Sequence, residues 1–404
     1  MAPVGSFESL MAAIQGGANS IYFGVEQLNM RSQSSFNFTL NDLSEIAGIC
    51  KENGIKSYLT VNCIIYDEDI DQMKEVINAA KDSGISAVIV SDQAAINYAR
   101  TVGVEVHIST QLNISNIETL KFYAPYADVV VLARELNMDQ VKNIYNKIVT
   151  ENIVGPKGKL IEIEMFCHGA LCMAISGKCY LSLHEANKSA NKGSCRQICR
   201  RSYDVKDRET GAELYVDNKY IMSPKDLCTI DFIDKMIDSG VRVFKIEGRA
   251  RSAEYVKRVC ECYNEAIESV LDGSFSQEKV EKWKEIMLTV FNRGFWDGYY
   301  LGRKLGEWST NYGSSATQKK VYVGKVTNFF SKLSVVEVLV EASPLGLNEE
   351  LVITGPTTGV VELTTSELRV DLKVTDEVKQ GVKCSFVTPE LVRRGDKVYR
   401  MEAR

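Results

Sequence analysis

The sequence predicts an α/β fold: a (β/α)8 TIM-barrel-like domain that carries a cysteine-rich insertion and is followed by a small C-terminal all-β barrel domain. Three observations predict it. Short apolar segments alternate with amphipathic ones along the first part of the chain, which is the pattern of parallel strands joined by helices. Six of the eleven cysteines crowd between Cys167 and Cys228. From Lys319 onward, short β-type runs separated by turns replace the alternation.

Seven candidate strands carry the first observation, and a helix-like stretch follows each of them. They are 20–24 (SIYFG), 56–61 (KSYLTV), 87–91 (AVIVS), 105–109 (EVHIS), 129–133 (VVVLA), 161–166 (IEIEMF) and 243–247 (VFKIE). The opening residues, MAPVG, have the character of the end of another strand, which makes eight, the strand number of a closed barrel. A doubly wound open sheet is the competing fold. The barrel is favoured because no glycine-rich dinucleotide-binding loop follows an early strand.

The regular alternation stops between Phe166 and Val243, and most of the clustered cysteines lie in this interval. We therefore expect an insertion at about 167–235. An insertion after a barrel strand lies on the C-terminal face of the barrel, where barrel active sites form. The predicted barrel domain covers residues 1–310. A stretch of small polar residues then leads to the predicted β domain at 319–404.

The composition excludes several classes of protein. With 45% hydrophobic and 25% charged residues, the chain has enough apolar surface to fold, so it is not a disordered protein. No apolar run is long enough to span a bilayer, and we expect no membrane partner. The net charge of −5 means that any nucleic-acid contact must use a local basic patch. The best such patch is 188–201, whose cations either contact RNA phosphates or stabilise nearby thiolates.

The cysteines predict both a location and a cofactor. Their odd number and the lack of a secretory pattern at the opening indicate a reducing cytoplasm. The clustered members have neither the C-x2-C pairs of zinc ribbons nor the C-x2-C-x2-C run of ferredoxins. Irregular spacing in an enzyme loop favours a single four-iron cluster, with zinc and free or redox-active thiols as alternatives. The clustered cysteines are Cys167, Cys172, Cys179, Cys195, Cys199 and Cys228.

Several stretches resemble the U32 family, once classed as collagenase-like peptidases. The most specific is 164–182 (EMFCHGALCMAISGKCYLS). The others are 2–9 (APVGSFES), 191–203 (NKGSCRQICRRSY), 225–228 (KDLC) and 244–249 (FKIEGR), so the resemblance runs over nearly the whole chain.

The resemblance implies a barrel-like catalytic domain, an oxygen-sensitive [4Fe–4S] cluster and oxygen-independent hydroxylation. One branch of the family hydroxylates the wobble uridine of tRNA at C5 and requires prephenate, and others act on ribosomal RNA cytidine or on ubiquinone precursors. The predicted β domain favours the tRNA branch, with tRNA and prephenate as partners. The implied cluster ligands are Cys172, Cys179, Cys195 and Cys228, with Cys199 as the alternative ligand.

Charged residues at the expected active face complete the predicted site. Lys245, Glu247 and Arg249 alternate along the last barrel strand, so they share one face and either bind an anionic substrate or form an ionic layer inside the barrel. Glu164 is a proton relay beside the cluster or a structural hydrogen-bond acceptor. His168 lies among the cysteines and is a second candidate for proton handling.

Two rival functions remain open. A peptidase would need a nucleophile and a base, yet the chain has no HExxH helix and no GxSxG elbow, which leaves a Cys172–His168 dyad. The second rival is a zinc-stabilised scaffold that binds RNA without catalysis. The predicted function is therefore an iron–sulfur enzyme that hydroxylates tRNA, with a peptidase, another hydroxylation substrate such as ribosomal RNA, and a zinc scaffold as alternatives.

Overall fold

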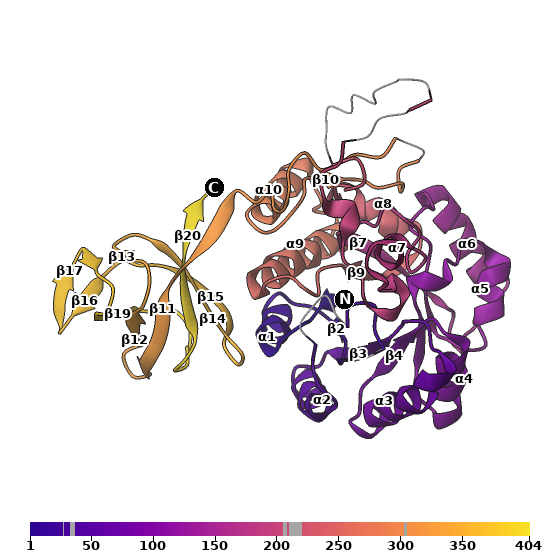
Figure 1. Cartoon of the computed structure of the whole chain (residues 1–404), viewed down its shortest axis with the longest axis horizontal. Helices are drawn as coiled ribbons and strands as arrows, with labels where there is room; N and C mark the ends of the chain where they lie inside the picture. The colour runs from indigo at the N-terminus through magenta and orange to yellow at the C-terminus, as the bar shows by residue number, and fades with distance from the viewer. Residues whose placement is uncertain (27, 33–36, 205–207, 210–219, 303–304) are drawn as a thin grey trace.

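The structure is a computed structural model, and it describes residues 1–404 apart from 27, 33–36, 205–207, 210–219 and 303–304. It contains a larger α/β body and a smaller all-β body (Figure 1). Each body has its own cluster of buried hydrophobic residues. No helix among the described residues has the length and apolar character needed to cross a membrane.

The larger body is built on a mostly parallel sheet. Neighbouring strands in sequence are neighbours in the sheet from the first to the seventh, and β9 then pairs in parallel with β7. These eight strands are β1 (Ala2–Pro3), β2 (Ser20–Phe23), β3 (Lys56–Val61), β4 (Ala87–Val90), β5 (Val106–Ile108), β6 (Val129–Val131), β7 (Glu162–Gly169) and β9 (Val241–Ile246). All the predicted strand segments of this region are confirmed.

Backbone hydrogen bonds also connect the first and last of these strands. Ile246 in β9 donates its N–H to the carbonyl of Met1 at 3.1 Å, and the amino group of Met1 donates to Phe244 at 2.7 Å. Two short strands extend the sheet beside the end of β7. They are β8 (Asp226–Cys228), antiparallel to β7, and β10 (Phe295–Trp296), parallel to β8.

Helices connect the strands and, apart from α7 in the insertion, cover the outer side of the sheet (Figure 1). They are α1 (Phe7–Gln15), α2 (Leu43–Glu52), α3 (Ile70–Asp82), α4 (Gln93–Val102), α5 (Ile117–Tyr123), α6 (Met138–Thr150), α7 (Leu181–Ala186), α8 (Ile233–Asp238), α9 (Ala253–Leu271) and α10 (Gln277–Leu288). Helix α4 shows how the sequence sets their limits. The side chain of Asp92 accepts the N–H of Ala94 at its start, and Gly103 ends it at a φ of 80°.

The smaller body follows at Gln318 and is all-β, as predicted. Its main sheet has the strand order β15-β14-β20-β11-β12-β19-β16-β17, and β13 pairs with β18 beside it. The strands are β11 (Gln318–Phe330), β12 (Val335–Val340), β13 (Leu345–Gly346), β14 (Glu350–Gly355), β15 (Gly359–Thr364), β16 (Leu368–Val370), β17 (Lys373–Thr375), β18 (Glu377–Val378), β19 (Lys383–Val387) and β20 (Lys397–Ala403).

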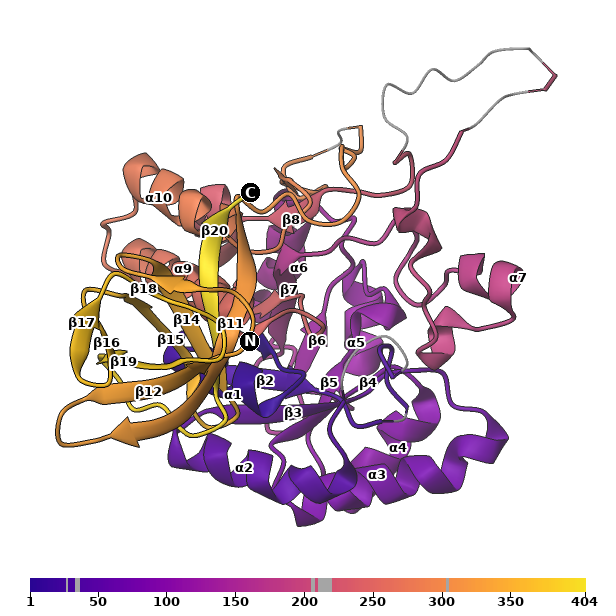
Figure 2. The same ribbon diagram turned by 60° about the vertical axis from the view of Figure 1, so that its left-hand side comes forward.

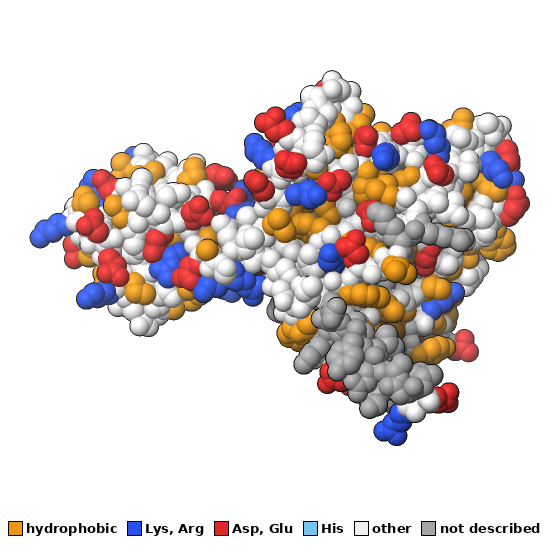
Figure 3. Space-filling view, turned by 90° about the horizontal axis from the view of Figure 1, so that it is seen from above, with side chains coloured by type: hydrophobic (Ala, Val, Ile, Leu, Met, Phe, Trp, Pro, Cys, Tyr) orange, Lys and Arg blue, Asp and Glu red, His pale blue; other side chains and the backbone are white. Residues whose placement is uncertain are grey.

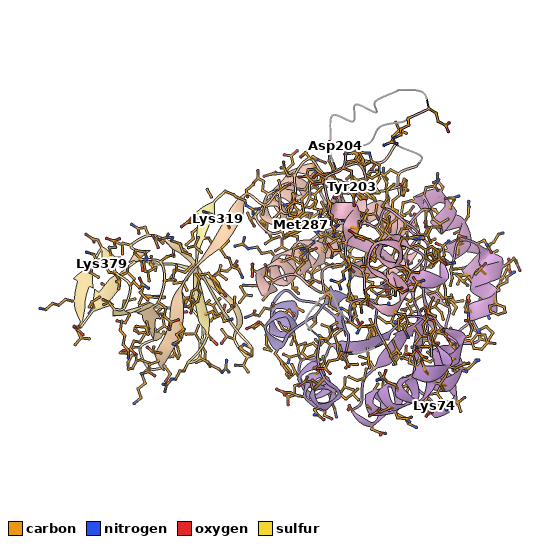
Figure 4. All side chains as sticks on the ribbon, viewed as in Figure 1. Lys74, Tyr203, Asp204, Met287, Lys319 and Lys379 are labelled. Carbon is orange, nitrogen blue, oxygen red and sulfur yellow. The ribbon has the colours of Figure 1, made fainter. Side chains whose placement is uncertain are left out.

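The two bodies meet where β14 and β15 approach α1 and α9 (Figure 2). The Gln15 side chain in α1 accepts the N–H of Val360 at 2.9 Å, and Arg258 in α9 pairs with Glu362 at 2.6 Å. Figure 4 labels Lys319 at the end of the smaller body next to the larger one, and Lys379 at its far end. The contact is therefore made by one end of the smaller body.

Candidate functional site

A cavity of about 470 Å³ lies at the carboxyl ends of the parallel strands. Side chains from strand ends form its floor, among them Tyr22 of β2, Thr60 of β3 and Lys245 of β9. Residues 170–181 of the cysteine-rich insertion also line it. The insertion therefore lies at the face where a barrel enzyme builds its active site, as the sequence predicts.

Four cysteines of the insertion line this one cavity: Cys172, Cys179, Cys195 and Cys199. Cys172 is exposed and the other three are half-buried, and all four are free thiols. Burial raises the pKa of the Cys199 thiol, and the neighbouring Cys172, Cys195 and Cys179 raise it further. All four thiols therefore face one shared cavity.

The structure separates Cys228 from this group, contrary to the ligand set that the resemblance implies. Cys228 lies in β8, is 3% exposed and does not line the cavity. The Tyr263 hydroxyl lies 3.8 Å from its sulfur atom, and burial raises the pKa of its thiol to about 11. Strand β8 pairs with the end of β7, and the Cys228 thiol lies against Tyr263 of α9. Cys199, the alternative ligand, takes its place at the cavity.

Two glycines let the backbone of the insertion pack against the cavity floor. Gly169 has a φ of 101°, and a Cβ atom there would lie 2.2 Å from the carbonyl oxygen of Glu247. Gly193 has a φ of 81°, and a Cβ atom there would lie 2.4 Å from the carbonyl oxygen of Asn29. A larger residue would be strained at both positions and would push the cysteine loops away from the floor.

Arg200 fixes the loops that carry Cys172 and Cys199. Its guanidinium donates to the carbonyl of Leu171 at 2.6 Å and to the carbonyl of Pro224 at 2.7 Å. One side chain therefore joins three segments of the insertion. Two other members of the predicted basic patch also have partners within the protein, because Lys192 pairs with Asp69 and Arg201 pairs with Glu185. This part of the patch serves the fold of the insertion.

The predicted trio Lys245, Glu247 and Arg249 is brought together at the cavity. Only Lys245 lies within β9, and the other two follow the strand end. Glu247 pairs with Arg31 at 3.0 Å and accepts the hydroxyl of Tyr22 at 3.2 Å. Burial opposes ionisation of Glu247, but Arg31, Arg134 and Arg249 together outweigh it and lower the pKa of this carboxyl. The cavity therefore contains a carboxylate that is held ionised.

Lys245 forms a buried ion pair with Glu164. Its Nζ atom lies 2.7 Å from Glu164 Oε1, and the two residues are 5% and 0% exposed. Glu164 lies beneath Lys245 and does not line the cavity. Behind it, His107 Nδ1 is 4.0 Å from Glu164 Oε2, and His107 Nε2 is 3.4 Å from Glu105. These side chains form an ionic layer in the interior of the sheet. Lys245 is the member of this layer that reaches the cavity.

His168 does not line the cavity, and its prediction as a catalytic residue is corrected here. The pairing of β7 with β9 shifts register between Phe166 and His168, which alters the alternation of side chains along β7. The His168 ring is 1% exposed and packs against Tyr255 and Tyr263 of α9. Burial lowers its pKa from 6.5 to about 3, so the ring is neutral at physiological pH. The Cys172–His168 dyad of the peptidase alternative is therefore not formed.

The buried His168 predicts an acid sensitivity of folding. Its pKa is about 3 in the folded chain against 6.5 as the ordinary value, so the unfolded chain binds the proton more tightly. The stability is complete above pH 6.5 and falls as the pH drops toward 3, by up to about 1.4 kcal/mol per unit. We expect His168→Gln to remove that part of the slope. Urea unfolding at several pH values between 4 and 7 measures the slope, and an unchanged slope in the variant would contradict this assignment.

Arginines make the cavity strongly cationic. Its described lining residues include six arginines and two lysines against one carboxylate, that of Glu247. The sequence analysis did not single out four of these arginines: Arg31, Arg134, Arg251 and Arg293. Arg134 directly follows the predicted strand 129–133, which is the position of an active-site side chain in a barrel. The other three lie in loops, and no local sequence pattern indicates that these loops line the cavity.

The rim of the cavity is apolar. Met173 and Ile175 are each 47% exposed, and Tyr180 is 64% exposed. Seen from above, the larger body shows patches of hydrophobic side chains among charged ones (Figure 3). A cationic interior with an apolar rim suits an anionic ligand that carries a ring or another flat apolar group.

Comparisons with known proteins agree with the motifs in the sequence. The model of peptidase family U32 matches residues 5–310. A protein of Porphyromonas gingivalis named "Collagenase" is 60% identical over 404 residues, which cover 100% of this chain and 98% of that protein. The "tRNA hydroxylation protein P1" of Bacillus subtilis is 33% identical over 337 residues, 81% of this chain and 77% of that protein. A 23S rRNA 5-hydroxycytidine synthase of Escherichia coli is 31% identical over 299 residues, 72% of this chain and 43% of that protein.

Proposed function

The chain belongs to peptidase family U32, and from this premise we propose that it is an iron–sulfur enzyme that hydroxylates RNA. The specific reaction we propose is oxygen-independent, prephenate-dependent C5-hydroxylation of the wobble uridine in tRNA. Relatives named for tRNA hydroxylation and for rRNA hydroxycytidine synthesis support an RNA substrate. The observation that carries the proposal is the convergence of Cys172, Cys179, Cys195 and Cys199 on one cationic cavity. An RNA substrate also favours a cytoplasmic location.

The four thiols around one cavity fit a [4Fe–4S] cluster. A four-iron cluster takes one thiolate on each iron, so its ligands lie further apart than those of one zinc ion. Cys172, Cys179, Cys195 and Cys199 would hold the cluster. When bound, it would supply electron transfer or Lewis-acid chemistry.

The other residues of the cavity bind, orient and exchange protons. Lys245 and Arg249 give the floor positive charge for a carboxylated co-substrate such as prephenate. Lys245 Nζ is the atom that can exchange a proton with a bound ligand, and Glu164 is the positioning residue behind it. Arg31 keeps Glu247 ionised, so this carboxylate can accept a hydrogen bond from the substrate.

The proposal includes the architecture around the site. The hydrogen bonds between Met1 and β9 support a sheet closed as a (β/α)8 barrel over residues 1–310. The separate hydrophobic cluster of the smaller body supports a β domain at 319–404. We assign this domain, as a small β-barrel, to the positioning of tRNA beside the cavity.

Mass spectrometry of RNA nucleosides tests the function. We expect cells that lack the gene to lose the wobble nucleosides derived from 5-hydroxyuridine, and a plasmid carrying the wild-type gene to restore them. A plasmid carrying Cys199→Ala should not restore them. Loss of a hydroxylated nucleoside from ribosomal RNA instead would move the substrate to that RNA. Unchanged nucleosides in both RNAs would overturn RNA hydroxylation.

A peptidase is the second candidate, because relatives of high identity carry the name collagenase. The geometry gives it less support, since among the described residues no histidine is hydrogen bonded to a cysteine of the cavity. Incubation of the pure protein with collagen peptides tests it. Turnover that Cys172→Ser abolishes would favour the peptidase, and no turnover would leave RNA hydroxylation as the function.

A further inference from the structure

We infer that Arg251 and Arg293 form an anion-binding subsite of the cavity, which holds a carboxylate or phosphate group of the ligand. This subsite uses neither the four cysteines nor Lys245 and Arg249. It does not depend on the proposed function, because it follows from the arrangement of charges alone.

The two arginines converge from loops that are distant in the sequence. Arg251 follows β9, and Arg293 follows α10. Both guanidinium groups lie against the ring of Phe291, at 3.4 Å and 5.0 Å from its centroid. Both residues line the cavity, and Arg293 is 8% exposed. Two like charges are therefore held against one ring, with Arg293 buried and Arg251 half-buried.

The protein supplies too little negative charge for them. Arg293 lies 3.3 Å from the carboxylate of Asp226, which is 3% exposed. The guanidinium of Arg251 has no hydrogen-bond acceptor among the described residues, and Glu247 is already paired with Arg31. Burial lowers the pKa of Arg251, and Arg293 lowers it further. A buried excess of positive charge is costly unless an anion balances it, and a pair of guanidinium groups matches the oxygens of a carboxylate or phosphate.

The cysteine loops already hold a different arginine, Arg200, whose guanidinium donates to the carbonyls of Leu171 and Pro224. Arg251 and Arg293 are therefore left to bind an oxyanion of a ligand. The oxyanion can come from a small carboxylated molecule or from an RNA phosphate.

Thermal unfolding of the full chain, purified without oxygen, tests the subsite. The probes are malonate and inorganic phosphate, compared with chloride at equal ionic strength. We expect at least one probe to raise the melting temperature of the wild type. Arg251→Gln should weaken this effect at least about tenfold in affinity, because one of two charged partners is lost. Without anion, this variant should melt at the same temperature as the wild type or higher, since a like-charge contact is relieved. If Arg251 had only a structural role, its replacement would lower the melting temperature instead.

Arg242→Gln is the matched control, because Arg242 also stacks on a ring, that of Tyr145 at 5.1 Å, but lies outside the cavity. It should keep the full anion effect. A wild type that does not respond to either anion, or an Arg251→Gln variant that responds fully, would overturn the inference. If Arg251→Gln is both destabilised and unresponsive, Arg251→Lys decides: a recovered response supports the subsite, and no response overturns it. Preference for malonate indicates a small carboxylated ligand, and preference for phosphate indicates RNA.

Discussion

Replacing Cys199 by serine is expected to abolish iron binding, whereas replacing Cys228 by alanine is expected to preserve it. Both cysteines are candidates for the fourth cluster ligand on the sequence alone. The structure places Cys199 at the cavity with Cys172, Cys179 and Cys195, and it buries Cys228 beside Tyr263. A cluster held by three thiolates is lost readily because its fourth iron has no protein ligand.

The measurement is the iron and sulfide content of protein purified without oxygen, together with its thiolate-to-iron absorbance. The wild type and Cys228→Ala should be brown and hold about four irons per chain. Cys199→Ser should be nearly colourless. The reverse result would return Cys228 to the ligand set and would require β8 to detach from β7. Zinc at one equivalent in the wild type, with no iron, would support the scaffold alternative.

The strands of the larger body could be predicted from the sequence because each is a short apolar run between polar helices. The same regularity located the insertion, since it is the place where the alternation stops. Lys245 lies at the cavity within β9, and Glu247 lies at the cavity just past the end of that strand. Local pattern was enough wherever a side chain's direction depends only on its own strand.

Local pattern was not enough where two segments determine a position together. His168 was a candidate because it lies among the cysteines in the sequence, but β7 shifts register just before it and its ring packs against α9. The spacing of the cysteines could not separate Cys199 from Cys228, because the choice depends on the pairing of β8 with β7. Arg251 and Arg293 carry no motif of their own, and only the folded loops bring them to the ring of Phe291.

Replacing Lys245 by methionine is expected to produce the largest loss of stability of any single change at the site. The variant would leave the carboxylate of Glu164, which is 0% exposed, without its 2.7 Å partner. The Nδ1 atom of His107 lies 4.0 Å from Glu164 Oε2, too far for a hydrogen bond, so it does not replace the ammonium group. Breaking a buried ion pair from one side typically costs about 3–5 kcal/mol, since the other charge stays buried and uncompensated.

The double variant Lys245→Met with Glu164→Gln separates the pair's role in folding from its role at the cavity. It removes both charges, so we expect it to recover most of the stability that Lys245→Met loses. RNA hydroxylation should remain lost in the double variant, because the ammonium group that faces the ligand is gone. Urea unfolding gives the stabilities, and nucleoside analysis of complemented cells gives the activity. A Lys245→Met variant as stable as the wild type would show that Glu164 is not held as a carboxylate. A fully active double variant would mean that the pair serves the fold alone and that another group of the cavity exchanges protons with the ligand.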